Sequence, residues 1–529
     1  MHDLIIGNAT IYDGLGAEPR QGSVSVANGR IAEIGSVTGE ARSRIDAKGL
    51  ALMPGIIDTH THYDAQITWD PFANPSPALG VTTLVMGNCG FSIAPCRPAD
   101  RDLTMRNLTH VEGMSLDALR AGIDWGFESY PQYLDMLEKK GVGPNVACFV
   151  GHSSVRTFVL GADAPKRAAT AGEVKTMRRI VAEAMEAGAV GFATTRSGQH
   201  NGEAGIPMPS RLADEHELTT LSAALRDGGK GLLMMTKGAD TPVPWIEKLC
   251  EAAGRPYLVA ALLHSNLAPE ASFEDLDHIR AARKRGNRMY GAVSPCPLNF
   301  EFTMHEPYVF EGLRVWQALM AMDGKSFRRT LADGAWRGKL KNELEERSRR
   351  MFTGEWNKAH VAQVADAKHA AYEGKSIAAL ALEAGAHPVD FMLDLALEEN
   401  LDTVFTATLL NSDEDAVGRM MRDENAIVSL SDAGAHLTFL CDAGFGLHVL
   451  GHWVREKKLM PLEQAILKLT SEPAALFDMK DRGVIAAGKP ADLLLFDPKT
   501  VGRGPSRRIF DLPAGGSRLT TPATGVHGV

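Results

Sequence analysis

The chain has 529 residues, of which 44% are hydrophobic and 23% charged, and its formal net charge is −9. This composition is typical of a globular enzyme and excludes a largely disordered chain, while the acidic balance gives no basic surface for nucleic acid. We find no signal peptide, no apolar stretch near the roughly 20 residues of a membrane span, and no disulfide framework among the six cysteines, so we expect a soluble cytoplasmic protein without nucleic-acid or membrane partners.

Short strands are expected at both ends of the chain. Near the N-terminus, Asn28-Gly29 separates two apolar runs, and this dipeptide favours a hairpin because both turn positions need a positive φ. Near the C-terminus, residues 493–496 show the same alternation of strand and turn. We therefore expect residues 1–54 and 480–529 to form one composite β-sandwich domain.

Between these ends, apolar strand segments alternate with helical segments over residues 55–479, which favours a parallel sheet. The eight strand candidates are residues 52–57, 81–86, 146–150, 189–194, 231–235, 257–263, 288–293 and 426–430. The predicted fold class is α/β, a (β/α)8 TIM barrel. The polar, charged segment near residues 314–375 predicts a helical insertion between the last two barrel strands.

The first barrel strand runs directly into His60-Thr61-His62. Residues i and i+2 of a strand face the same side, so both imidazoles point into one space. The C-terminal strand ends of such barrels carry the active site, which favours a metal site over two histidines that occur together by chance.

Two stretches carry a family resemblance: PGIIDTHTH, which contains this motif, and GVIAAGKPADLLLFD near the C-terminus. Together with residues 80–83 and 87–90, they resemble the amidohydrolase superfamily, in particular its N-acyl-D-amino-acid deacylase (D-aminoacylase) branch. The resemblance covers nearly the whole chain and implies a metal-dependent hydrolase of a small-molecule amide.

The resemblance implies further metal ligands at other strand ends. Cys89 matches a cysteine ligand whose thiolate suits Zn²⁺, although a small buried hydrophobe is the alternative. His264 matches a metal histidine or is a buried core histidine. Asp432, in SDAGAH, resembles the last-strand aspartate, which would bind or border the metal and act as the catalytic proton carrier; the alternative is an ordinary turn residue. In this mechanism a metal-activated water attacks the carbonyl carbon.

The sequence departs from the family at the strand over residues 231–235. Met234 or Met235 stands where the deacylases carry another histidine, and a thioether is a poor Zn²⁺ ligand. We therefore predict one firmly bound Zn²⁺ and a doubtful second site. Whether the ligands are chiefly His60, His62 and Asp432, or chiefly Cys89 and His264, stays open.

Three residues are substrate-binding candidates. Asn266 stands where the family carries a lysine for the substrate carboxylate, and it cannot supply charge. Tyr290 matches a substrate-contacting tyrosine, and His152 is either a donor to the substrate or a structural histidine. An N-acyl amino acid is therefore the first expectation, with another amide, a cyclic amide or a carbamate as alternatives. A catalytically inactive scaffold or binding protein is the alternative of another class, and a homo-oligomer is possible in either case.

Overall fold

The computed structural model describes residues 1–346, 350–438 and 440–529. Its centre is an eight-stranded sheet in which every neighbouring pair is parallel. In spatial order the strands are β6 (Ile56–Asp58), β7 (Val81–Met86), β8 (Asn145–Gly151), β9 (Gly191–Thr195), β10 (Leu232–Thr236), β11 (Tyr257–Leu262), β12 (Met289–Val293) and β16 (Ala426–Val428).

The ring closes beyond the ends of β6 and β16. Thr61 and Ala433 form a parallel bridge, and the His62 N–H donates to the Ala433 carbonyl at 2.7 Å. The predicted (β/α)8 barrel is thereby confirmed.

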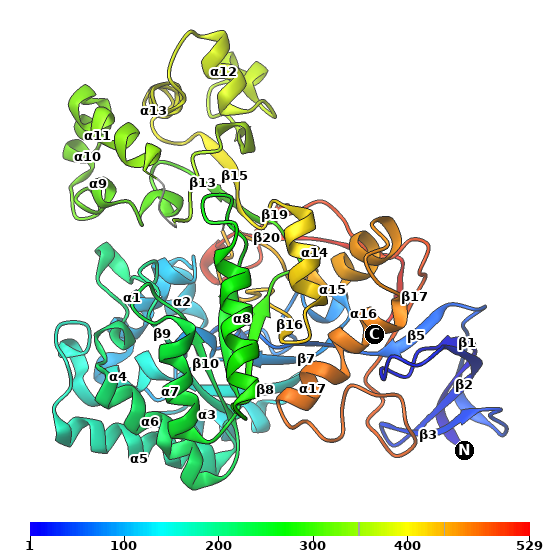
Figure 1. Ribbon diagram of the computed structural model, residues 1–529. Coiled ribbons are helices and arrows are strands. Elements are labelled where there is room, and N and C mark those ends of the chain that lie inside the picture. Colours follow the sequence, from blue (N-terminus) through cyan, green and yellow to red (C-terminus); the bar gives the residue numbers. More distant parts are fainter. Residues whose placement is uncertain (347–349, 439) are drawn as a thin grey trace.

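Helices cover the outside of the barrel (Figure 1). In α5, a capping box joins Thr170 and Glu173, and the helix ends at Gly188 in the left-handed region. The helices are α1 (Arg101–Val111), α2 (Leu116–Gly122), α3 (Tyr130–Lys140), α4 (His152–Leu160), α5 (Ala171–Ala187), α6 (Glu215–Gly228), α7 (Val243–Ala253), α8 (Ala271–Lys284), α14 (Glu414–Arg422), α15 (Phe445–His448), α16 (Leu462–Leu469) and α17 (Ser471–Leu476).

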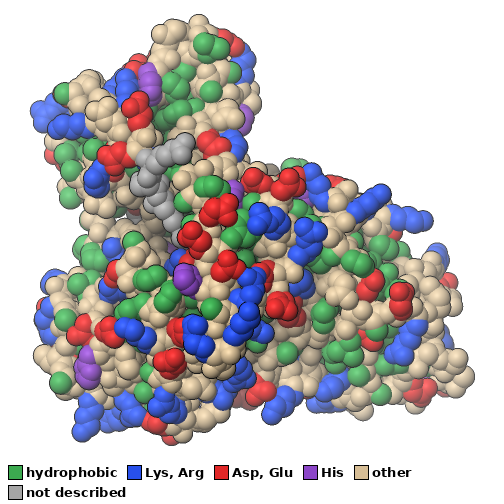
Figure 2. All heavy atoms as spheres, in the orientation of Figure 1, with side chains coloured by type: hydrophobic (Ala, Val, Ile, Leu, Met, Phe, Trp, Pro, Cys, Tyr) green, Lys and Arg blue, Asp and Glu red, His purple; other side chains and the backbone are tan. Residues whose placement is uncertain are grey.

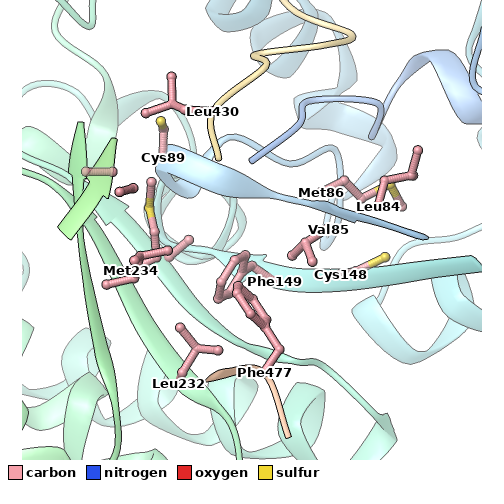
Figure 3. Packing of buried hydrophobic residues seen from close by; sticks show 14 of the residues in the cluster. Leu84, Val85, Met86, Cys89, Cys148, Phe149, Leu232, Met234, Leu430 and Phe477 are labelled. Atoms are coloured by element: carbon pink, nitrogen blue, oxygen red, sulfur yellow. The ribbon is translucent and has the colours of Figure 1, made fainter. Parts of the chain in front are cut away.

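Apolar side chains fill the barrel. Figure 3 shows Phe149 and Phe477 packed at one end of this core, with Met234 further along the barrel and Cys89 at the opposite end. The Phe149 and Phe477 rings lie 6.0 Å apart. The core is therefore closed at one end, and Cys89 marks the end where strand-terminal side chains meet.

Both chain termini contribute to a separate sheet. Asn28 and Gly29 have φ values of 52° and 70°, as the predicted hairpin requires. The C-terminal β17 pairs antiparallel with the N-terminal β5. The seven strands are β1 (His2–Ile11), β2 (Arg20–Ala27), β3 (Arg30–Gly35), β4 (Ala41–Asp46), β5 (Ala51–Pro54), β17 (Leu493–Phe496) and β22 (Val526–Gly528).

Part of the C-terminal segment does not join this sheet. It forms two small antiparallel pairs, in one of which the Leu519 N–H donates to the Leu437 carbonyl at 2.8 Å in the loop after β16. The pairs are β18 (Gly502–Arg503) with β21 (Ala523–Thr524), and β19 (Arg507–Ile509) with β20 (Arg518–Thr520). The chain end therefore contacts the barrel mouth as well as the terminal sheet.

An insertion between β12 and β16 forms a lobe beside the barrel mouth (Figures 1 and 2). It covers more of the sequence than the predicted residues 314–375. It contains a three-stranded sheet and its own apolar cluster, which includes Phe302, Trp316 and Phe405. Its elements are β13 (Leu298–Phe302), α9 (Arg314–Gln317), α10 (Gly324–Ala332), α11 (Gly334–Glu345), β14 (Ala359–Gln363), α12 (Ile377–Glu383), α13 (Pro388–Glu398) and β15 (Val404–Leu410).

Candidate metal centre

Three side chains from the first two barrel strands meet at the barrel mouth. His60 and His62 follow β6, and Cys89 follows β7 in a tight turn where its φ is 56°. The Cys89 Sγ lies 3.5 Å from Nε2 of His60 and 4.0 Å from Nε2 of His62. Within the described residues, these three form the group of His, Cys, Asp or Glu whose ligand atoms lie within 4.8 Å of one another.

Asp432 joins this group from the far side of the ring. Its Oδ1 lies 3.2 Å from Nε2 of His60 and 3.5 Å from Nε2 of His62. Its backbone N–H donates to the His60 carbonyl, and this hydrogen bond is one of the contacts that close the barrel. Barrel closure therefore brings a residue 372 positions away in sequence to within hydrogen-bond range of His60.

The four side chains have complementary electrostatics. Burial lowers the pKa of His60 to about 4, so its imidazole is neutral at neutral pH. Burial raises the pKa of Asp432, but the hydrogen bond with His62 and the neighbouring imidazoles of His60 and His436 outweigh it, and the pKa falls well below its ordinary value. Burial raises the pKa of the Cys89 thiol, so a cation that binds the thiolate must displace a proton.

This donor set fits a divalent metal ion. Two imidazole nitrogens, a thiol and a carboxylate oxygen converge in a buried site, and His, Cys and Asp are the side chains that bind Zn²⁺. Strand β10 presents Thr236, whose hydroxyl is 3.1 Å from the Cys89 Sγ, while Met234 lies within the core. At β10 a hydroxyl, not a histidine or a thioether, therefore borders the site.

Glu112 supports this group, and the sequence analysis did not identify it. It follows α1, and its Oε1 lies 3.3 Å from Nδ1 of His62. A carboxylate behind a ligating imidazole fixes the orientation of the ring and leaves the other nitrogen for the metal. No motif surrounds Glu112, so the sequence offered no signal for it.

His60, His62, Cys89 and Asp432 are together called the donor group. They lie in a cavity of about 510 Å³. Barrel loops line one part, and the insertion lines another. Apart from the donors, Thr236 and Glu112, the lining residues are Phe91, Val111, Ser197, Gly198, Gln199, His200, Lys237, Gly238, Ala239, Pro242, Ala261, Leu263, Leu298, Phe300, Tyr308, Arg350, Met351, Leu410, Leu430 and His436.

The structure does not bring His264 and Asn266 to the donor group. The His264 ring lies 6.5 Å from the Phe273 ring, and its backbone N–H donates to the Asn411 side chain. The Asn266 amide donates to Glu355 at 2.9 Å, which ties the barrel to the insertion. The β11 strand end presents Ala261 and Leu263 to the cavity instead.

His152 and Tyr290 also lie outside the cavity lining. His152 is fully buried, with Nε2 2.7 Å from Glu217 and Nδ1 2.8 Å from the Thr194 hydroxyl. Tyr290 lies near the start of β12, where the Arg283 guanidinium stacks 4.3 Å from its ring centroid. These contacts are with other side chains of the chain, and a role of His152 or Tyr290 in substrate binding stays a prediction.

Comparison with known proteins agrees with this architecture. The amidohydrolase family model matches residues 44–515. D-aminoacylase from Alcaligenes xylosoxydans xylosoxydans is 29% identical, with 100% of this chain and 93% of that protein covered. N-acyl-D-aspartate deacylase from the same organism is 30% identical, over 94% of this chain and 86% of that protein.

Comparison with a solved structure also agrees with this architecture. N-acyl-D-glutamate deacylase from Bordetella bronchiseptica, complexed with zinc and a phosphonate that mimics the tetrahedral intermediate, is similar with a TM-score of 0.66 and 25% identity, over 99% of this chain and 94% of that one.

A parallel barrel with imidazole, thiol and carboxylate donors at its mouth defines a metal-dependent hydrolase. The chain belongs to the amidohydrolase family, whose match covers most of its length. It is an enzyme that hydrolyses carbon–nitrogen bonds other than peptide bonds. In the parts of the chain that the structure describes, no helix is long and apolar enough to span a membrane.

Proposed function

We propose that this enzyme hydrolyses the amide bond of an N-acyl amino acid or a related small amide, with one Zn²⁺ held by His60, His62, Cys89 and Asp432. The observation that carries the proposal is the approach of the Asp432 carboxylate to both imidazoles inside the cavity. The relatives named for N-acyl-D-amino acids support the substrate class.

The proposed chemistry needs a cation and a base at one place. A divalent cation supplies a Lewis acid that makes water acidic enough to lose its proton near neutral pH. Asp432 is ionised because its pKa lies well below the ordinary value, so its carboxylate can accept that proton. After attack on the carbonyl carbon, Asp432 returns the proton to the leaving nitrogen.

The remaining donors act by position. His60, neutral at neutral pH, offers an Nε2 lone pair to the cation, and Cys89 offers a thiolate once its proton has left. Thr236 borders Cys89, and Ala261 and Leu263 occupy the next strand end. This composition supports one cation rather than two.

The test combines metal analysis with turnover. We expect chelator-treated protein to lose hydrolysis of N-acyl amino acids and zinc to restore it at about one equivalent. Cys89→Ser should lose both zinc and activity. Cys96→Ser is the matched control, because Cys96 is buried but bonds to Thr104, outside the donor group. Protein that binds no zinc, or zinc-loaded protein that cleaves none of the N-acyl amino acids of either hand, would overturn the proposal.

A further inference from the structure

Aromatic rings lie close to the donor group. The Phe91 ring lies 6.1 Å from the His62 ring and 4.9 Å from the His200 ring. His436 follows Asp432 by four residues, and its ring lies 6.1 Å from Phe300 and 5.9 Å from Tyr308. A group bound next to the reacting carbonyl therefore meets aromatic faces.

The insertion supplies much of this apolar wall. Leu298 and Phe300 lie two residues apart on β13, so they share one face of the strand, and Leu298 pairs with Leu410 of β15. Tyr308 and Met351 continue the wall into the cavity. Four of these five side chains are apolar, and the fifth is a tyrosine with a large apolar ring.

The two described cations of the cavity already have partners. Lys237 forms an ion pair with Asp275. The Arg350 guanidinium donates to the backbone carbonyls of Phe352 and Glu343, both at 3.0 Å. A substrate carboxylate would have to compete with these contacts, which disfavours a second acidic group on the substrate.

The volume of the cavity also allows a large substrate group. A cavity of about 510 Å³ lies within the range of about 300–1,000 Å³ that holds drug-sized ligands. Such sites are mostly apolar with a few polar groups that fix orientation, and here those polar groups include the donors, Ser197, Gln199 and His200.

From this wall we propose that the substrate carries a bulky apolar group, aromatic or branched aliphatic, beside the scissile amide, in contrast to the aspartate and glutamate in the names of two similar enzymes. This inference rests on the proposed function. The bulky group lies against Phe300 and Tyr308, whether it belongs to the acyl or the amine side of the amide.

The first experiment measures kcat/KM of zinc-loaded enzyme for both hands of N-acetylphenylalanine, N-acetylleucine, N-acetylaspartate and N-acetylglutamate, with N-phenylacetylglycine and N-acetylglycine. We expect at least one bulky apolar compound to exceed both the acidic compounds and N-acetylglycine by about 10-fold or more, since one methylene in an apolar pocket is worth about 10- to 200-fold. The two phenyl compounds distinguish the acyl from the amine side. Equal values, or a preference for the acidic compounds, would overturn this inference and leave the proposed function intact.

The second experiment changes the wall. Phe300→Ala should lower kcat/KM for the best bulky substrate by about 10-fold or more relative to N-acetylglycine, with the loss mainly in KM. Phe300→Leu retains apolar volume for folding and should show a smaller shift in the same ratio. Phe302→Ala and Phe302→Leu are the controls, because Phe302 lies on the same strand but packs against Phe405 and Phe310 in the insertion core. Parallel losses on both substrates in the Phe300 variants, or the same selective loss in the Phe302 variants, would contradict the inference.

Discussion

At the scale of single residues, Asp432 combines two roles that its position makes compatible. Its carboxylate lies beside both imidazoles and remains ionised in a buried site. Asp432→Asn keeps the shape and one oxygen but removes the base, so kcat should fall by about 10²- to 10⁴-fold while zinc content stays near one equivalent.

Steady-state kinetics and metal analysis on the same preparation check this prediction. Asp481→Asn is the control, because Asp481 is an exposed aspartate outside the cavity. A near-normal kcat in Asp432→Asn would remove Asp432 from the proton transfer.

Glu112 acts through His62 rather than on the substrate. Removal of the carboxylate frees the imidazole to rotate, so Glu112→Ala should weaken zinc binding by about 10- to 100-fold, with a smaller effect for Glu112→Gln. Competition titration with a chromophoric chelator measures the affinity directly. Glu203→Ala, which removes the exposed partner of Arg106 on α1, should leave it unchanged. Unaltered zinc affinity in Glu112→Ala would contradict a positioning role.

The sequence could predict the donors but not their supports. His60 and His62 share a strand and a face, so spacing alone places them together, while Cys89 and Asp432 required a family resemblance. His264 also follows a buried strand, but the structure turns it towards Phe273, because the last inward positions before it are Ala261 and Leu263. Glu112 follows a helix, where neither spacing nor a motif relates it to the barrel mouth.

At the scale of elements, the segment that closes the barrel depends on Gly434. Its φ is 86°, and a Cβ there would lie 2.8 Å from backbone atoms of His62 and Tyr63. Gly434→Ala should therefore lower the free energy of unfolding by about 2–5 kcal/mol and weaken zinc binding, because strain and overlap add.

Denaturant unfolding and zinc titration test this expectation. Gly488→Ala is a matched control, because Gly488 has a φ of 82° with nothing within 4 Å of the added Cβ, so it should lose only about 1 kcal/mol and keep full zinc affinity. Equal losses in the two variants would show that close packing at Gly434 is unimportant.

The insertion depends on a buried carboxylate. Glu399 accepts hydrogen bonds from the backbone N–H groups of Ala365 and Asp366, from the Thr403 hydroxyl, and contacts His369. Burial raises the pKa of Glu399, but these bonds outweigh it and lower the pKa to about 2 from the ordinary 4.5.

Because the folded-state pKa is lowered, Glu399 stabilises the insertion fully above pH 4.5, and this stabilisation is lost as the pH falls from about 4.5 towards 2. The protection of residues 359–410 from hydrogen exchange, corrected for the intrinsic exchange rate at each pH, should therefore fall in that window in the wild-type protein. Glu399→Gln should exchange faster at neutral pH and show less change across the window; identical profiles for the two proteins would refute the assignment.

At the scale of the whole molecule, the candidate metal centre joins the ends of β6, β7 and β16, so zinc bound there would favour the closed ring over the open chain. At a free zinc concentration about 1,000-fold above the dissociation constant, the folded state gains about 4 kcal/mol. Chelation should lower the melting temperature by several degrees, and added zinc should restore it, as calorimetry can measure. The melting temperature of Cys89→Ser should not change when the chelator is added. A decrease equal to that of the wild type would show that Cys89 does not belong to the zinc site that stabilises the ring.

The architecture was largely readable from the sequence, but the boundaries were not. Apolar strands alternating with helices predicted the barrel, and the Asn28-Gly29 turn predicted the terminal sheet. The insertion extends beyond residues 314–375, because β13 and β15 pair across more than 100 residues and no local pattern reports such pairing. The cytoplasmic location and a homo-oligomer remain predictions.

The order of the barrel strands along the chain has a consequence for synthesis. The ribosome completes seven of the eight strands, and then the entire insertion, before β16 and Asp432 emerge. Until then the nascent chain contains His60, His62 and Cys89 but not Asp432. Strand β5 lacks its pairing partner β17 for longer still, because β17 follows β16 in the chain. A polypeptide released before β16 lacks both the strand that closes the ring and Asp432, so we expect hydrolytic activity only from chains translated beyond residue 433.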